Sequence, residues 1–284
     1  MNTLPIGTIQ TMTVLRKIET GYVLQKNTNE VLMHHNETEH ELEQGQPVEV
    51  FLYLDKKGQT VATTHLPSIR MDTYDWAEVV EVIPNLGAFV NIGIAKEILV
   101  SKDELPLFET VWPKTGDMLY VTLGKDRKGR LLAIPATEGV FAREWELAPE
   151  NVLNTPISGR VYRTSKEGTA VITNEGYRGF IHHTERKREP RLGEWVNGRV
   201  IEVKDDGTLN ISLRPLKQDS ISEDAEAILS HLEEKGGIIP FSDKSDPEDI
   251  RSTFQISKAA FKRALGKLMK DGKIEQYDGN TYLK

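Results

Sequence analysis

Two pairs of adjacent histidines occupy matching places in the chain. They lie in Met33-His34-His35-Asn36-Glu37 and in Ile181-His182-His183-Thr184-Glu185, and in each case a glycine follows eight residues after the glutamate. Imidazoles can bind a metal ion or stack on a ligand ring. Neighbouring side chains on a strand point to opposite faces, so the two histidines of a pair would not meet at one ion. No third ligand follows at zinc spacing, and we expect neither a metal nor a cofactor.

Basic side chains gather in the downstream part of the chain. Residues 156–217 contain 12 Lys and Arg residues and 8 Asp and Glu residues, a net charge of +4, whereas the whole chain carries −7. The densest run, Arg186-Lys187-Arg188, could hold phosphate oxygens; the alternative is a solvated loop. One basic segment in an acidic chain permits a local polyanion site and weakens non-specific binding, because the surrounding field repels phosphates.

The segments that carry these residues are typical of short β-strands. Apolar and polar residues alternate along three stretches, each bounded by glycines: Gly45–Gly58, Gly116–Gly129 and Gly193–Gly207. The alternation predicts strands with one buried face, and turns such as Asp126-Arg127-Lys128-Gly129 predict hairpins. A unit of about 70 residues is thus used three times. About five short antiparallel strands per unit leave open edges unless the sheet closes, so we expect small barrels.

The hydrophobic period becomes helical after Pro215. Capping residues mark helix starts at Asp246-Pro247-Glu248 and at Ser257. The third helix of this region would bury Phe261, Leu265, Leu268 and Met269. Asp278-Gly279 predicts the turn of a closing hairpin. Helices followed by a hairpin are the plan of a winged helix, a variant of the helix-turn-helix.

The repeated unit resembles the S1 RNA-binding domain, a five-stranded OB-fold barrel. The third unit carries Gly179-Phe180-Ile181-His182-His183-Thr184-Glu185, the second carries Leu86-Gly87-Ala88-Phe89-Val90, and the first is the most degenerate. With the winged helix, the domain order is similar to that of the conserved virulence factor B (CvfB, YitL-like) family of Gram-positive bacteria. We expect a mostly β chain with a C-terminal α+β domain, its four domains spanning 1–66, 72–138, 155–216 and 220–284.

The resemblance implies a platform for single-stranded RNA. In S1 domains two aromatic rings on one strand, a histidine on the next strand and an Asp–Arg pair in the last hairpin form this platform. In the second unit these positions hold Leu86, Phe89, Ser101, Asp126 and Arg130. One ring and one guanidinium would therefore remain. Phe89 could instead belong to the barrel core, because alternation does not decide the face.

The third unit keeps only part of the platform. His182 is present, although it could be a structural histidine near a strand end, and Glu167 and Ala170 stand at the ring positions. The residues that could stack instead are Tyr162 and Tyr177. The basic residues that would follow the phosphates are Arg160, Arg163, Lys166, Arg178, Lys187, Arg188 and Arg214. The winged helix would add Arg263, Lys267 and Lys270, unless these serve only solubility and the helix dipole.

The resemblance implies a non-catalytic protein that binds single-stranded RNA and regulates gene expression after transcription, with virulence genes among its targets. We expect it in the cytoplasm. RNA-processing or translation machinery would be its protein partner. The sequence lacks cysteine, a spanning-length apolar run and a signal peptide. It also lacks a P-loop and a Gly-x-Ser-x-Gly motif, so we expect neither an enzyme nor a small-molecule substrate. The alternatives are a protein-interaction scaffold and a DNA-binding regulator that uses the winged helix.

Overall fold

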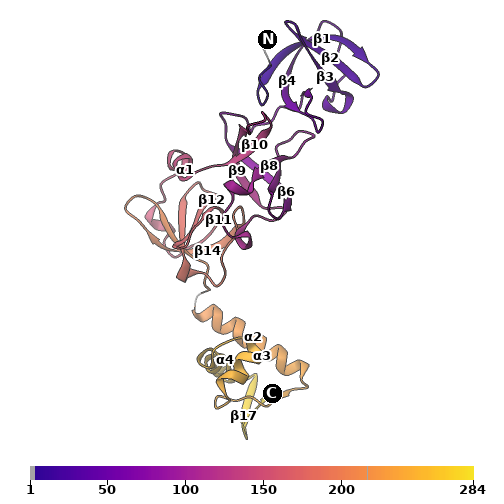
Figure 1. Ribbon diagram of the computed structural model, residues 1–284. Helices are drawn as coiled ribbons and strands as arrows, with labels where there is room; N and C mark the ends of the chain where they lie inside the picture. Colours follow the sequence, from indigo (N-terminus) through magenta and orange to yellow (C-terminus); the bar gives the residue numbers. More distant parts are fainter. Residues whose placement is uncertain (1–3, 216) are drawn as a thin grey trace. The chain divides into compact units, whose positions relative to one another are not determined.

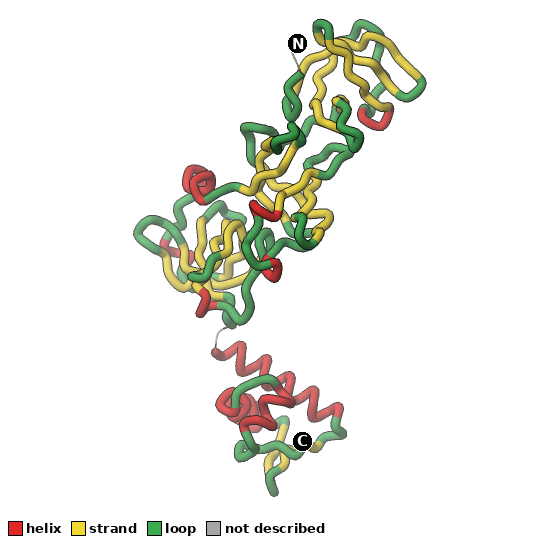
Figure 2. The backbone as a smooth tube through the Cα atoms, viewed as in Figure 1, coloured by secondary structure: helices red, strands yellow, loops and turns green. Residues whose placement is uncertain are grey.

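A computed structural model describes residues 4–215 and 217–284. The chain divides into two compact units, one ending at Leu213 and the other beginning at Arg214. The first unit holds three closed barrels of strands, and the second holds helices with a small sheet (Figures 1 and 2). The predicted ranges 1–66 and 155–216 extend into residues 1–3 and 216, which lie outside the described residues. None of the described helices combines the length and the apolar character needed to cross a bilayer.

The first barrel closes in the order β1-β2-β3-β5-β4. Its strands are β1 (Ile9–Ile18), β2 (Gly21–Lys26), β3 (Asn29–His34), β4 (Pro47–Leu54) and β5 (Thr60–Thr63). A 3-10 helix, η1 (His35–Glu37), follows β3. The core contains Met12, Leu24, Met33, Val50 and Leu52. These residues alternate with outward ones along their strands, as the sequence pattern predicted.

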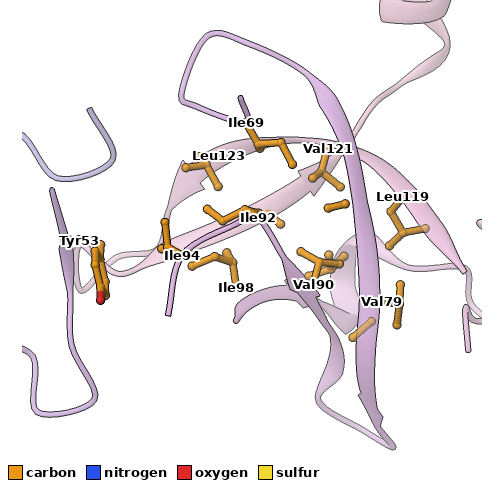
Figure 3. Packing of buried hydrophobic residues seen from close by; sticks show 14 of the residues in the cluster. Tyr53, Ile69, Val79, Val90, Ile92, Ile94, Ile98, Leu119, Val121 and Leu123 are labelled. Carbon is orange, nitrogen blue, oxygen red and sulfur yellow. The ribbon is translucent and has the colours of Figure 1, made fainter. Parts of the chain in front are cut away.

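The second barrel closes in the order β10-β8-β7-β6-β9. Its strands are β6 (Asp75–Ile83), β7 (Gly87–Asn91), β8 (Ile98–Ser101), β9 (Met118–Lys125) and β10 (Leu131–Pro135). Two 3-10 helices, η2 (Lys102–Glu104) and η3 (Glu109–Val111), lie between β8 and β9. Figure 3 shows core side chains of this barrel, among them Val79, Val90, Ile98, Leu119 and Val121.

The third barrel closes in the order β11-β12-β13-β15-β14. A helix α1 (Glu138–Glu144) and a 3-10 helix η4 (Glu150–Val152) precede it. Its elements are β11 (Pro156–Thr164), β12 (Gly168–Thr173), β13 (Arg178–His182), η5 (His183–Glu185), β14 (Trp195–Val203) and β15 (Leu209–Ser212). The core contains Val161, Val171, Ile181, Val200 and Leu209. The predicted plan of three five-stranded barrels is thus confirmed.

The second strand of every barrel begins at a glycine, for a steric reason. At Gly21, Gly87 and Gly168, an added Cβ would lie 2.0, 2.0 and 2.4 Å from a carbonyl oxygen of the neighbouring third strand. Real Cβ atoms do not approach backbone oxygen so closely. Only glycine therefore lets the second and third strands pair tightly at this point in each barrel.

The first and second barrels share a buried interface. Phe51 and Tyr53 point outward from β4, away from the core of their own barrel, and join the hydrophobic cluster of the second barrel. Tyr53 lies at one edge of that cluster (Figure 3). Its hydroxyl donates to Glu37 Oε1 at 2.7 Å, and burial, followed by the Glu37 hydrogen bond, raises the pKa of Tyr53 above its ordinary value. The stretch Val50–Tyr53 of β4 is therefore buried on both faces of the strand.

The second unit is a winged helix. Its elements are α2 (Lys217–Glu234), β16 (Ile238–Ile239), α3 (Pro247–Phe254), α4 (Lys258–Lys270), β17 (Ile274–Tyr277) and β18 (Asn280–Leu283). The side chain of Asp246 accepts from Glu248 N at 2.7 Å, and Ser257 Oγ accepts from Ala260 N at 3.2 Å, which confirms both predicted helix starts. Met269, which we predicted in the core, is exposed. It follows the buried Leu268 by about 100° around α4, which carries it past the apolar face.

Candidate nucleic-acid interface

The second barrel presents an aromatic ring on its outer surface. Ala88 and Val90 are fully buried in the core, so Phe89 between them points outward, where it is half-buried. In the β7–β8 register Phe89 lies opposite Leu99. Leu86, at the other predicted ring position, is exposed. The core alternative for Phe89 is therefore not what the structure shows.

The third barrel has its ring on the adjacent strand. In the β12–β13 register Ala170 lies opposite Phe180, just as Phe89 lies opposite Leu99. Phe180 points outward because its neighbour Ile181 is fully buried in the core. Its ring lies over Gly168, with Cζ only 2.4 Å from where a Cβ would stand. Sequence reasoning missed Phe180, although the alternation around Ile181 could have revealed it.

His182 and His183 lie close together, which corrects our argument from strand alternation. Their ring centroids are 4.2 Å apart, because β13 ends at His182 and the chain turns into η5. Both residues are exposed, and Nδ1 of His182 lies 2.8 Å from Thr184 Oγ1. No group of three or more His, Cys, Asp or Glu side chains suited to a metal ion occurs among the described residues.

The linker helix α1 covers the predicted platform position of the third barrel. Phe141 is 4% exposed, and its ring centroid lies 5.3 Å from that of Tyr120 in the second barrel and 4.0 Å from that of Tyr162 in the third. Ala170 belongs to the same buried cluster. Tyr162 is thus covered and cannot stack on a base. Tyr177 is half-buried and packs against the barrel core.

Two of the arginines that we predicted to contact phosphates form ion pairs between the linker and the third barrel instead. Arg178 forms an ion pair with Glu138 and donates from Nε to Tyr162 Oη at 2.9 Å. Its guanidinium also lies 4.7 Å from the Trp145 ring centroid. Arg163 Nη1 is 3.6 Å from Glu138 Oε2. Burial raises the pKa of Tyr162, opposed by the hydrogen bond and charge of Arg178. These side chains fasten the linker to the barrel.

A second network holds the basic run itself. Arg188 donates from Nη1 to Glu194 Oε2 at 2.9 Å and forms a further ion pair with Oε1. Arg186 is buried, where it bonds to Thr169 and pairs with Glu189 at 3.1 Å. Burial by itself raises the pKa of Glu194, but hydrogen bonds and charges from its arginine partners outweigh burial, and the pKa lies below its ordinary value.

The predicted Asp–Arg pair of the second barrel closes a hairpin. Asp126 accepts from the backbone N–H of Lys128 at 2.8 Å and of Arg130 at 2.9 Å. Its Oδ2 also accepts from Arg130 Nε at 2.7 Å. The backbone hydrogen bond from Arg130, followed by the bond from its side chain, lowers the pKa of Asp126. The guanidinium itself stays largely exposed and can still meet a phosphate.

Most of the predicted cations are exposed, but Arg163 and Arg188 among them are already paired with glutamates. Lys166, Lys187 and Arg214 are exposed in the third barrel and just after it. On α4, Arg263 and Lys270 are exposed, and Lys267 Nζ pairs with Asp271 at 3.2 Å. Arg160 lies between two tryptophans at the junction of the second and third barrels. Carboxylates therefore already neutralise part of the exposed basic charge.

Family comparisons match every part of this architecture. Residues 74–134 match the CvfB first S1-like domain, 142–215 the second domain of virulence regulatory factor CvfB, 226–283 the CvfB-like winged helix domain and 6–65 an S1 domain. The S1-like and winged-helix domains indicate nucleic-acid binding.

Several relatives cover nearly the whole chain. The protein YitL of Bacillus subtilis (strain 168) is 46% identical over 274 residues, which are 96% of this chain and 92% of YitL. Conserved virulence factor B of Staphylococcus aureus (strain USA300) is 36% identical over 282 residues, 98% of this chain and 94% of that protein. A Streptococcus pneumoniae TIGR4 crystal structure, described as a multidomain protein with nucleic acid binding domains, has a TM-score of 0.67 and 38% identity and covers 99% of both chains.

Proposed function

This chain belongs to the conserved virulence factor B (CvfB) family, and we propose that it binds single-stranded RNA without catalysis and regulates gene expression after transcription. It would act in the cytoplasm, beside RNA-processing or translation machinery. Virulence genes would be among those it regulates.

One observation carries the proposal. Two barrels present an outward aromatic ring at the same cross-strand pair, Phe89 in the second barrel and Phe180 in the third. OB-fold barrels bind single strands by stacking bases on such rings, at about 1–3 kcal/mol per base and with little sequence preference. Rings alone would not hold a duplex, whose bases are already stacked. The arrangement therefore favours a single strand over duplex DNA.

The exposed cations fit this mode of binding. Arg130 of the second barrel and Lys166 and Lys187 of the third are exposed near the ends of these barrels' strands. Each cation that replaces a counterion on the RNA contributes to the salt dependence of binding, with a slope of about −0.7 per phosphate for single strands. Because carboxylates pair with several of the exposed cations, we expect a moderate salt slope and a large share of stacking in the affinity.

The test is fluorescence anisotropy of a labelled single-stranded RNA with the full-length protein at two salt concentrations, with duplex DNA as competitor. We expect binding that weakens with salt and that duplex DNA does not displace. A gel of the same RNA after incubation should show it intact, as a non-catalytic protein requires. Absence of binding even at low salt would overturn the proposal and favour a protein-interaction scaffold.

A DNA-binding regulator is the second candidate, because α4 exposes Arg263 and Lys270 where a recognition helix would meet a phosphate backbone. In that case the protein would bind labelled duplex DNA directly, and Arg263→Glu would abolish that binding. The same substitution would leave the affinity of the barrels for single-stranded RNA nearly unchanged.

A further inference from the structure

A tryptophan lies exposed beside an arginine at the junction of the second and third barrels. Trp195 begins β14 and is 38% exposed. Arg160 pairs with it across β11 and β14, and its guanidinium carbon lies 5.1 Å from the Trp195 ring centroid. The same carbon lies 5.5 Å from the ring centroid of Trp76 on β6. One ring from each barrel thus flanks a single cation.

Arg160 is held in place by the backbone. Its Nη1 donates to Gly193 O at 3.0 Å, and the side chain is half-buried. Burial lowers the pKa of Arg160, opposed by the charge of Asp117, but an arginine remains charged at any physiological pH. A fixed positive charge therefore lies against the indole of Trp195.

This surface is separate from the ring pairs of the proposed function. Phe180 projects from β13, whereas Trp195 and Arg160 lie on β14 and β11, which are neighbours at another part of the barrel wall. The same outer surface continues with Ser158 and Asn197, which pair in register. Ser158 Oγ donates to Asn197 Oδ1 at 2.7 Å. Polar groups able to bond a base edge thus lie one step along the strands from the ring.

Tryptophan is highly buried in most proteins, whereas Trp195 keeps part of its indole exposed at this junction. Because the Trp195 side chain is 38% exposed, part of its ring surface is open beside Arg160. Aromatic rings and arginine planes are the groups on which unpaired bases stack. The net charge of +4 on residues 156–217 suits a phosphate backbone.

We propose that Trp195, positioned by Arg160, stacks on an unpaired base of single-stranded RNA and forms a second contact site at the barrel junction. This inference rests on the proposed function, since it assumes that RNA binds the barrels. The strand would run past the junction as well as across the rings of Phe89 and Phe180.

The test uses full-length protein and single-stranded RNA in two assays. In anisotropy titrations, Trp195→Ala should weaken binding about 5- to 150-fold, the equivalent of one stacked base. Trp195→Phe should restore most of the affinity. The matched control is Leu153→Ala, an exposed apolar residue that precedes the same barrel, and it should leave affinity unchanged. In the second assay, RNA carrying iodouracil is irradiated, and the cross-linked peptide should contain Trp195.

The outcomes separate this site from the proposed function. If Trp195→Ala binds as wild type and no cross-link reaches Trp195, while Phe89→Ala and Phe180→Ala still lose affinity, the junction site is wrong and the proposed function stands. If wild-type protein binds no RNA, both are wrong. If Trp195→Ala lowers the melting temperature, the proposal is judged on the other two results. A wild-type cross-link at Trp195 and near-normal affinity of Trp195→Phe support the site, and the absence of the cross-link contradicts it.

Discussion

Arg191 of the third barrel binds Asp117 of the second through two hydrogen bonds, with Nε 3.1 Å from Oδ2 and Nη2 3.2 Å from Oδ1. The two side chains are only 21% and 10% exposed. Arg191 Nη1 also lies 3.3 Å from Glu194, and the next residue, Leu192, donates its N–H to Val111 O of the second barrel at 2.9 Å. Part of the basic charge that the sequence assigns to RNA therefore joins two barrels.

Arg191→Ala should destabilise this junction strongly. It leaves the carboxylate of Asp117 poorly solvated and without its partner, which for buried pairs costs about 3–5 kcal/mol. Urea unfolding should show the loss. The control is Arg16→Ala, because Arg16 pairs with Glu30 at 3.2 Å on the open surface of the first barrel, where a pair contributes at most about 1 kcal/mol. Equal effects of the two substitutions would contradict the interpretation.

Glu194→Gln should lower the free energy of unfolding in a pH-dependent way. The folded pKa of Glu194 lies below its ordinary value, so its stabilisation is complete above the unfolded pKa of about 4.3 and is lost as the pH falls through the folded pKa. We expect a loss of about 1–3 kcal/mol at neutral pH that shrinks toward zero in acid. Unfolding curves at neutral pH and at about pH 3 measure this. Glu30→Gln, at an exposed site, should change stability by at most about 0.5 kcal/mol at neutral pH.

Phe89→Ala and Phe180→Ala should each weaken RNA binding about 5- to 150-fold, since each removes one stacking ring. Because both rings lie outside the barrel cores, the melting temperature should change little; a loss of about 3–5 kcal/mol would instead mark a core residue. Phe108→Ala is the matched control. Phe108 is exposed on the second barrel, but it lies in an acidic loop between Glu104 and Glu109, and its removal should leave RNA affinity unchanged.

Lys187→Glu should weaken RNA binding and reduce the steepness of its salt dependence without unfolding the protein. Lys187 is exposed, and losing one phosphate contact lowers the slope by about 0.7 for a single strand. Arg178→Glu is the comparison variant. Arg178 pairs with Glu138 and Tyr162, so reversing its charge should lower the melting temperature of the protein. Affinity and slope that stay unchanged in Lys187→Glu would remove this loop from the RNA site.

Local sequence signals predicted most of the fold. The glycine-bearing turns at Gly58 and Gly129 have positive φ, as hairpins of this kind require, and Ser257 caps its helix as expected. These features depend on a few adjacent residues, so their chemistry is visible in the sequence. Met269 was predicted wrongly because one residue of rotation around a helix moves a side chain from the core to solvent.

The candidate site was harder to predict because its contacts are long-range. Asp117 and Arg191 are 74 residues apart, and no local pattern pairs them. Phe180 was missed because the S1 pattern directed attention to the preceding strand, where Ala170 stands. That Phe141 would cover the position of Ala170 follows only from the tertiary structure.

The packing of Phe141 also shows that the repeated sequence unit and the stable unit need not be the same. The sequence repeats one barrel three times, and each barrel closes with its own five strands. Here the linker ring is shared between Tyr120 and Tyr162, so neither neighbouring barrel retains a complete set of contacts when the chain is cut beside α1. We therefore expect the second and third barrels to unfold together with the linker, so that fragments of single barrels would be less stable than the same barrels in the intact chain.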